Sequence, residues 1–253
     1  MLKHTENDPL AALAESDVHI WYRSTTLLDS DAVKSANKQL SIEERARRDR
    51  LHFGTDRRDF TIAHDLLRRA LSRYASTPPA HLRFATNEYG KPSIESMDPQ
   101  VRALSFSLSH TRGCVACAIT SNAPLGVDVE RTDRLLSVHE IADRYFSEEE
   151  AAWLRQCSDE MRHIRFAELW TLKEAFLKAV GVGLSGLRTC VSFRFKEPGR
   201  IEATGRLITD PREWHFALFE PVYNVRLSVA IRSVTPPRFF MRRPWLGYLC
   251  FDR

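Results

Sequence analysis

Two acidic side chains stand two residues apart in the apolar stretch from Leu125 to Glu130. On a β-strand successive side chains point to opposite faces, so Asp128 and Glu130 would share one face. Val127 and Val129 would occupy the other. Two carboxylates on one face offer the oxygen ligands that Mg²⁺ prefers, and they leave coordination positions for water and substrate phosphates. A solvated face of an edge strand is the ordinary alternative for these two residues taken alone.

A third carboxylate and an ammonium group lie on a later segment. Trp170, Glu174 and Lys178 follow one another at intervals of four residues, which aligns them along one side of a helix. Glu174 could complete a metal site or accept a proton, and Lys178 could neutralise a phosphate. The same spacing also occurs as an exposed Glu–Lys pair worth about 0.2–0.5 kcal/mol. Trp170 is expected to pack in the core and to fix the helix that presents Glu174.

Basic side chains that could bind a phosphate are concentrated earlier in the chain. The segment from Ser41 to Arg73 holds nine arginines, six acidic residues and no lysine. A cationic surface is one interpretation of this segment. A solvated helix face with i, i+4 pairs, such as Glu43 with Arg47, is the other.

Two further basic residues and a cysteine pair have an ordinary interpretation when each is taken alone. His110 precedes a turn at residues 111–113, and Lys91 lies in the turn Gly-Lys-Pro at residues 90–92. Cys114 and Cys117 have CxxC spacing, but on a strand positions i and i+3 point to opposite faces. No second pair accompanies them among the five cysteines, so we expect buried, reduced thiols rather than a zinc or redox site.

The composition is that of an ordinary folded protein and bounds the class of function. The chain has 253 residues, 43% of them hydrophobic and 28% charged, with a net charge of +4. That balance does not indicate a nucleic-acid or membrane partner. No apolar run is long enough to cross a bilayer, and the polar N-terminus lacks the apolar core of a secretion signal. We therefore expect a cytoplasmic protein.

The candidate residues fall on strands and helices that the sequence also predicts. Period-two alternation predicts a strand over 17–23, and a capping-box pair at Ser41 and Glu44 marks a helix start. Helical spacing from Asp56 predicts a longer helix, which ends before the Thr-Pro-Pro run at 77–79. Two strand-like runs predict a hairpin over about 104–120.

The order of elements is similar after a joint at residues 122–124. We expect a strand over 126–130, a second capping box at Ser147 and Glu150, a long helix over about 162–180, and strands near residues 191, 215 and 226. No internal sequence repeat is evident. The sequence thus predicts an α+β fold of two similar α/β subdomains, 1–124 and 125–253, each a small, mostly antiparallel sheet packed with a long helix. The aromatic segment from Pro236 is expected to pack back on the body.

Four motifs in order give this chain a family resemblance. They are Gly-Lys-Pro at 90–92, Phe-Ser-Leu-Ser-His at 106–110, Gly-Val-Asp-Val-Glu at 126–130, and Leu-Trp-Thr-Leu-Lys-Glu-Ala-Phe-Leu-Lys-Ala at 169–179 with Gly-Val-Gly-Leu at 181–184. Over about residues 17–232 the sequence resembles the surfactin-type 4'-phosphopantetheinyl transferases. One such motif would be weak, but four in register are specific.

The resemblance implies a role for each matched residue in the transfer reaction. Asp128, Glu130 and Glu174 match acidic ligands that hold Mg²⁺, or alternatively Mn²⁺, against the diphosphate of coenzyme A, and Lys178 matches a lysine on that diphosphate. Asp128, Glu174 and Lys178 are accordingly the catalytic candidates. Glu150 aligns with another acidic residue near the family's active site, although its capping-box position explains it locally.

The nucleotide end of coenzyme A is assigned to basic residues of the first half. Ser109 and His110 of the Ser-His motif, Lys91 of the Gly-Lys-Pro motif, and Arg47 near the first helices match the residues that grip it. Glu44 departs from the pattern, because relatives often carry a basic residue near this position.

The activity that the resemblance implies is transfer of 4'-phosphopantetheine to a serine of an apo acyl or peptidyl carrier protein, with release of adenosine 3',5'-bisphosphate. Glu174, a metal-bound water and Glu150 stay open as the proton acceptor, and fatty-acid, polyketide and peptide-synthetase carriers stay open as the partner. We expect a monomer without nucleic-acid or membrane partners. The rival interpretations are a non-catalytic module that binds coenzyme A or a carrier protein, and an RNA-binding protein that uses the arginine-rich segment.

Overall fold

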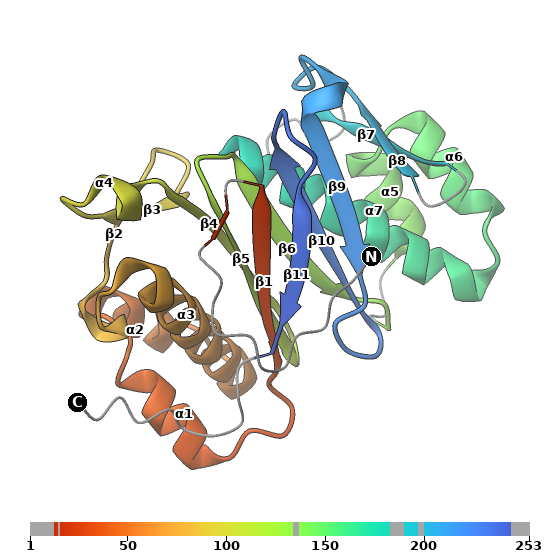
Figure 1. Ribbon diagram of the computed structural model, residues 1–253. Coiled ribbons are helices and arrows are strands. Elements are labelled where there is room, and N and C mark those ends of the chain that lie inside the picture. Colours follow the sequence, from red (N-terminus) through yellow and green to blue (C-terminus); the bar gives the residue numbers. More distant parts are fainter. Residues whose placement is uncertain (1–12, 15, 134–136, 183–189, 197–199, 244–253) are drawn as a thin grey trace.

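A computed structural model describes residues 13–14, 16–133, 137–182, 190–196 and 200–243 (Figure 1). The first half contains β1 (Asp17–Ser24), α1 (Ser30–Asn37), α2 (Ile42–Asp49), α3 (Gly54–Ala75), η1 (Pro79–His81), β2 (Arg83–Thr86), β3 (Pro92–Glu95), α4 (Pro99–Arg102), β4 (Leu104–Thr111) and β5 (Cys114–Ser121). The second half contains β6 (Leu125–Arg131), α5 (Val138–Tyr145), α6 (Glu148–Gln156), α7 (Asp159–Val180), β7 (Ser192–Lys196), β8 (Arg200–Thr204), η2 (Pro211–Glu213), β9 (Trp214–Phe219), β10 (Val225–Arg232) and β11 (Arg238–Arg242).

Two sheets lie at the centre, with one long helix on the outer side of each (Figure 1). The first sheet has the strand order β11-β1-β5-β4, and the second has the order β6-β10-β9. The hairpins β2-β3 and β7-β8 form two further small sheets. Among the described strands, every pair is antiparallel except β1 with β11. The predicted fold class, α+β with small antiparallel sheets and long helices, is confirmed.

Alternation along the strands fills three apolar clusters. Alternate side chains of β1, β5, β6 and β10 point into the space between the two sheets and form one apolar cluster. It includes Val18, Ile20, Ala116, Val127, Val129 and Leu227. The opposite parity of the first sheet packs on α3, and the second sheet packs on α7. Because both faces of β1 are covered, His19 and Trp21 are as buried as Ile20. The strand pattern at 17–23, typical of a half-buried strand, therefore marks a fully covered one.

The two halves repeat one topology that the sequence does not reveal. Each runs strand, short helices, a 22-residue helix, a hairpin and two more strands, and each places its last strand in the middle of its sheet, as β1-β5-β4 and as β6-β10-β9. β11 stands outside this repeat. It returns from the second half to pair with β1, and Phe239 contacts the ring of Phe219 on β9.

Local chemistry fixes the helix ends as the sequence indicates. Ser41 and Ser147 both form complete capping boxes with the glutamate three residues on. α3 closes at Ser76 and α7 at Gly181, each in the left-handed conformation that commonly ends a helix. α7 begins at Asp159, three residues earlier than predicted, because Ser158 caps it.

The C-terminal segment packs back through β11, as predicted for its first residues. The aromatic residues beyond Pro244, and Gly183 with Leu184 of the fourth motif, lie outside the described residues. The division at residue 124 stays a prediction. No helix in the described part of the chain is long and apolar enough to span a membrane.

Candidate active site

β6 and α7 approach each other unusually closely, and a glycine makes this possible. A Cβ added to Gly126 would lie 1.9 Å from the carbonyl oxygen of Ala175 and 2.7 Å from the amide nitrogen of Ala179. Any side chain there would push the strand off the helix. Asp128 shares the parity of Gly126, so it faces α7, while Val127 faces the central cluster. The predicted division of faces on this strand is confirmed.

An ion pair joins the strand to the helix at this contact. The Lys178 ammonium lies 2.7 Å from Asp128 Oδ1, and the Ser109 hydroxyl donates to the same oxygen at 2.7 Å. Lys178 also donates to the carbonyl oxygens of Val127, at 3.1 Å, and Leu108, at 3.4 Å. Asp128 therefore stands where β4, β6 and α7 meet, at the junction of the two halves.

Glu174 lies one helical turn before Lys178 and is held in an unfavourable environment. Burial, as the larger cause, and the Asp128 charge raise the pKa of its carboxyl from 4.5 to about 7, against the opposing effect of Lys178. Its Oε1 atom is buried and has no hydrogen-bond partner among the described residues. A buried carboxylate oxygen without a partner is costly, and a cation beside Asp128 would relieve that cost.

Glu130 lies one step further along the same face of β6. Its Oε1 accepts hydrogen bonds from Thr111 Oγ1 at 3.1 Å and from the amide nitrogen of Arg131 at 3.0 Å. As the side chains stand, no group of three His, Cys, Asp or Glu residues within the described ranges is arranged to hold a metal ion. Lys178 takes the position on Asp128 instead. The shared metal site of Asp128, Glu130 and Glu174 thus stays a prediction, which the orphaned Glu174 oxygen supports.

A pocket of about 230 Å³ opens next to Lys178, between the β2-β3 hairpin, β4 and the end of α7. Its lining includes Tyr89, Lys91, Pro92, Leu108, Lys178 and Val182. The Lys91 ammonium donates to the carbonyl oxygens of Ala179, at 2.8 Å, and Leu125, at 3.4 Å. Burial lowers the pKa of Lys91 to about 8. Lys91 thus ties the hairpin to both α7 and β6, and its stem forms part of the pocket wall.

His110 is exposed at the end of β4, on the sheet face that α3 covers. Strand alternation puts it on the same face as Phe106 and Leu108, which both pack in the cluster under α3. Its pKa is lowered by desolvation and by the positive charges of Lys178 and His64, against the opposing effect of nearby carboxylates. Ser109, its neighbour, points the other way and is buried against Asp128.

Comparison with known proteins supports the resemblance over about 80% of the chain. The model of the 4'-phosphopantetheinyl transferase superfamily matches residues 124–230, and that of the 4'-phosphopantetheinyl transferase N-terminal region matches residues 29–122. The 4'-phosphopantetheinyl transferase HetI of a Nostoc species is 30% identical over 205 residues, which are 80% of this chain and 86% of HetI. This chain belongs to the 4'-phosphopantetheinyl transferase superfamily. The predicted class of enzyme is confirmed.

Other relatives place the transferase in the two-domain, Sfp-type group. The 4'-phosphopantetheinyl transferase Sfp of Bacillus subtilis is 33% identical over 162 residues, 64% of this chain and 69% of Sfp. Among solved structures, the holo-[acyl-carrier-protein] synthase of Neisseria meningitidis has a TM-score of 0.37 at 18% identity, over 44% of this chain and 97% of that one.

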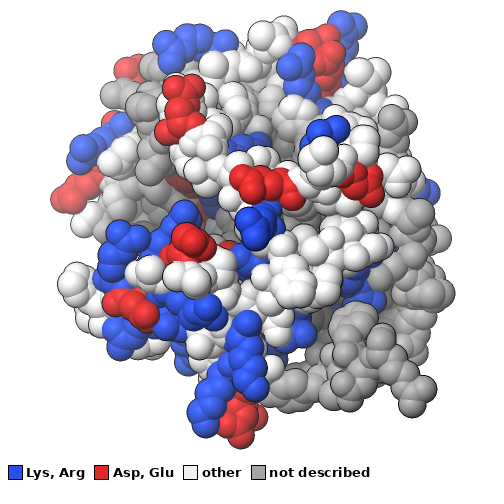
Figure 2. Space-filling model, turned by 90° about the vertical axis from the view of Figure 1, so that its left-hand side faces the viewer, with Lys and Arg blue, Asp and Glu red and all other residues white. Residues whose placement is uncertain are grey.

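The remaining predicted residues of the transferase lie farther from Asp128. Arg47 is exposed in the last turn of α2, and within the described ranges it makes no contact with the acidic site; its nucleotide role stays a prediction. Figure 2 shows the face of the molecule that carries α1 to α4, with both basic and acidic side chains on it. Within the arginine-rich segment, Arg48, Arg58 and Arg69 each pair with a carboxylate of the same segment.

Glu150 is engaged elsewhere in the transferase. Besides capping α6, its carboxylate lies 2.8 Å from the ammonium of Lys173 and accepts from the amide of Phe193 at 2.8 Å. Both members of the ion pair are buried. With its oxygens occupied by these partners, Glu150 has a structural explanation that is complete without catalysis.

The cysteine and tryptophan predictions agree with the structure. Cys114 lies in the cluster between the sheets and Cys117 in the cluster under α3, and both are free and buried. Burial raises the pKa of each thiol, so neither is a reactive thiolate. Trp170 packs against Phe166 and Tyr145, as a core residue beside Glu174 should.

Sequence reasoning missed Thr111, which donates to Glu130, and Lys173, which neutralises Glu150 away from the site. Ser109 was assigned to the nucleotide end, and in the structure its hydroxyl donates to Asp128. Alternation on β4 was an available signal, because Ser109 and Thr111 share the parity opposite to that of Leu108. No local signal in the sequence pairs Lys173 with a glutamate that lies 23 residues before it.

Proposed function

We propose that this transferase moves the phosphopantetheine arm of coenzyme A to a serine of an apo carrier protein at the site formed by Asp128, Glu130, Glu174 and Lys178. The observation that carries the proposal is the pairing of Asp128 with Lys178 beside the buried, unpartnered oxygen of Glu174. Charge is concentrated there at the edge of a pocket, in a chain that belongs to this superfamily.

The donor set fits a divalent cation. Three carboxylates from β6 and α7 would hold Mg²⁺, or Mn²⁺, and the unsatisfied Glu174 oxygen is the strongest support for this assignment. When bound, the cation would supply neutralisation of the charge that grows on the diphosphate oxygens. Lys178, now on Asp128, would then be released to a phosphate oxygen of the substrate as a point charge.

The bond changes assign a task to each side chain. The serine oxygen forms a bond to the β-phosphorus, and the bond from that phosphorus to the leaving adenosine 3',5'-bisphosphate breaks. The serine proton needs an acceptor, and Glu174, whose Oε1 has no hydrogen-bond partner among the described residues, is the candidate for that task. The contacts support Glu174 over Glu150 as that acceptor, because Glu150 is occupied by Lys173 and two backbone amides.

The nucleotide end is proposed to lie along the α3 side of β4. The pocket lined by Lys91 and Lys178 leads from the acidic site towards the β2-β3 hairpin, and His110 stands on the same side of the strand. Arg47 is the more distant candidate for the phosphates. Coenzyme A would therefore bridge the two halves of the transferase, as Lys178 and Lys91 already do.

The test is a transfer assay with a panel of apo fatty-acid, polyketide and peptide-synthetase carriers, coenzyme A and Mg²⁺, read by intact-protein mass spectrometry. We expect the phosphopantetheine adduct with the wild type and with Glu149→Gln, which changes an exposed acid on α6. Asp128→Asn should lose transfer while remaining folded. An adduct formed by Asp128→Asn at the wild-type rate would contradict the assigned site, and no adduct on any carrier would favour the non-catalytic binding module.

A further inference from the structure

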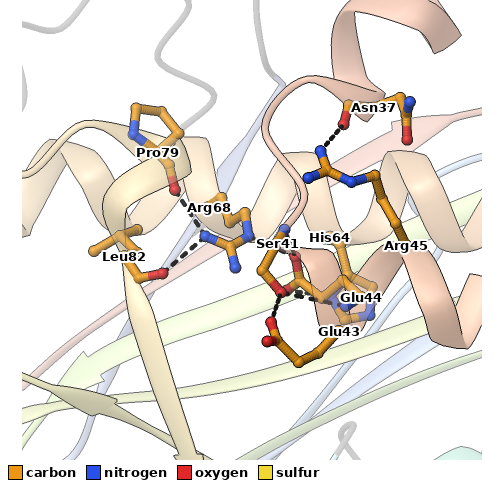
Figure 3. Close-up of polar contacts among 9 residues, drawn as sticks. All are labelled: Asn37, Ser41, Glu43, Glu44, Arg45, His64, Arg68, Pro79 and Leu82. Carbon is orange, nitrogen blue, oxygen red and sulfur yellow. Dashed lines mark hydrogen bonds and ion pairs between the residues drawn. The ribbon is translucent and has the colours of Figure 1, made fainter.

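In each half a buried cation ties the long helix to a short one. Figure 3 shows this tie in the first half, where Arg68 of α3 donates to Glu44 of α2. In α7 the cation is Lys173, which pairs with Glu150 of α6. Lys173 stands about 200° around the helix from Thr171, whose hydroxyl contacts the second sheet. The ion pair therefore holds α7 to α6 and leaves its position over β6 and β10 to other contacts.

A pair of buried hydroxyls joins α7 to β10. Thr171 Oγ1 and Ser228 Oγ lie 2.6 Å apart, and both residues are fully buried. Thr171 donates its proton to the carbonyl oxygen of Ala167 at 2.8 Å, so Ser228 donates the bond that the two hydroxyls share. A hydrogen bond between two short side chains is directional, whereas apolar packing is not. This hydroxyl pair therefore resists sliding or rotation of α7 over the sheet.

Ser228 stands on the same rung of the sheet as Asp128. The two residues are Cα partners in the pairing of β10 with β6, so their side chains lie on the same face, under α7. Thr171 and Lys178 are seven residues apart, which is about two turns along one side of the helix. One rung thus holds α7 at two points, through Ser228 at Thr171 and through Asp128 at Lys178. Glu174 lies between these two points.

The two points differ once substrate is bound. Under the proposed function Lys178 leaves Asp128 for a phosphate oxygen, and the second point is lost. Nearer the start of α7, Glu168 accepts from Arg226 of β10 at 3.3 Å, but the long arginine side chain can follow a small movement of the helix. The short side chains of the hydroxyl pair cannot, and the pair stands three residues before Glu174 in the sequence of α7.

We propose that the hydroxyl pair of Thr171 and Ser228 holds Glu174 in its working position beside Asp128 while Lys178 serves the substrate. The inference rests on the proposed function and gives two buried side chains a part in it. Both are positioning residues, because they act through Glu174. Losing the pair should weaken the chemical step and the affinity for the cation. Binding of the nucleotide end, assigned to the first half, should be spared.

The test begins with Thr171→Val, which keeps the shape of the side chain and removes its hydroxyl. We expect kcat to fall by about tenfold, because a small misplacement of a reacting group has a large effect on rate. The KM for coenzyme A should stay within about twofold of the wild-type value. The Kd of Mn²⁺ in the presence of coenzyme A, measured by electron paramagnetic resonance, should rise by about tenfold. Thr171→Ser, which keeps the hydroxyl, should restore both quantities to within about twofold.

A double variant separates positioning from stability. Thr171→Val alone leaves the Ser228 hydroxyl buried without its partner, which lowers the free energy of unfolding. Thr171→Val/Ser228→Ala removes that hydroxyl as well, so its stability in urea should return most of the way to the wild-type value. Its kcat and its Mn²⁺ affinity should stay as low as those of the single variant. Thr120→Val is the matched control, because it removes a buried hydroxyl that donates to the Asp17 carbonyl in the first sheet, and its kcat should be unchanged.

The outcomes distinguish this inference from the function on which it rests. A folded double variant with wild-type kcat and wild-type Mn²⁺ affinity would overturn the positioning role and leave the transferase assignment intact. An equal fall in kcat for Thr120→Val would also overturn it, because the loss would then follow from any buried hydroxyl. Failure of the wild type to transfer phosphopantetheine would instead count against the proposed function, and the positioning role would fall with it.

Discussion

The two long helices, α3 and α7, each contain a buried cation paired with a glutamate, but they differ in the polar residues of their last turns. Counting from Gly54 and from Asp159, the fifteenth residue is Arg68 in α3 and Lys173 in α7, and each cation is buried against a capping-box glutamate. The pair locks a short helix onto a long one in both halves. This buried ion pair is thus a structural feature of both halves, and it does not distinguish the half that carries the candidate active site.

The difference appears where strand and helix face each other. In the first half His19 of β1 shares a 2.6 Å hydrogen bond with the Tyr74 hydroxyl, and Arg242 of β11 covers the other ring nitrogen. In the second half a polar contact between strand and helix joins Asp128 to Lys178, at the edge of an open pocket. β11 closes the first site, whereas β4 of the other half supplies Ser109 to the second. One topology thus yields one closed polar cluster and one site open to a ligand.

The largest effect on stability is expected from breaking this buried ion pair. Lys173→Met leaves Glu150 buried without its cation and should lower the free energy of unfolding by about 3–5 kcal/mol. Arg68→Met should cost less, because His64 remains beside Glu44. Urea unfolding followed by circular dichroism measures both. The double variant Lys173→Met/Glu150→Leu should recover most of the loss, and a double variant no more stable than the single one would show that the pair is not the cause.

The closed cluster of the first half should control the pH dependence of stability. Burial and Arg242 lower the pKa of His19 from 6.5 to about 4. Between pH 4 and pH 6.5 the imidazole is protonated in the unfolded chain but stays neutral in the folded one. The free energy of unfolding therefore falls as the pH falls from 6.5 to 4. The slope from this group is at most about 1.4 kcal/mol per pH unit. His19→Asn should flatten the profile in urea unfolding across that window, and an unchanged slope would refute this origin.

The smallest effect concerns the hydroxyl that joins the halves at the open site. Ser109→Ala removes a hydrogen bond to an ionised carboxylate and should cost about 1.5–3 kcal/mol locally, seen as a fall in kcat of roughly 10- to 150-fold. Ser107→Ala removes the neighbouring bond from the Val127 amide, which does not involve a carboxylate, and should lower kcat less. Steady-state assays measure kcat for both variants. Equal falls in kcat would mean that Ser109 stabilises the contact between β4 and β6 in general rather than the Asp128 carboxylate.

Local patterns account for the parts of the fold that the sequence predicted. The capping boxes at Ser41 and Ser147, the hairpin over 104–120 and the parity of Asp128 all depend on neighbours within a few residues. The pairing of β1 with β11 joins residues more than 200 positions apart. No local pattern in the aromatic C-terminal segment indicates which strand it pairs with. The repeated topology could not be predicted for a similar reason. The two halves have the same order and packing of elements, but not the same residue types at matching positions.

The candidate site divides in the same way. Among the motif residues, Asp128 and Lys178 form an ion pair and Glu174 lies one helical turn before Lys178, but the direction of each ammonium was not predictable. Lys91 was expected to contact the nucleotide, which stays a prediction, and in the structure its ammonium donates to the carbonyl oxygen of Ala179. Which partner a long basic side chain selects depends on carbonyl groups brought together only by the fold.

The central claim is that Asp128, Glu130 and Glu174 gather around one divalent cation when coenzyme A is bound. Titration of the protein with Mn²⁺ in the presence of coenzyme A, followed by electron paramagnetic resonance, tests it without turnover. The account predicts one tight Mn²⁺ in the wild type and in Glu149→Gln, and its loss in Glu174→Gln and Asp128→Asn. Equal Mn²⁺ affinity in wild type and Glu174→Gln would contradict it.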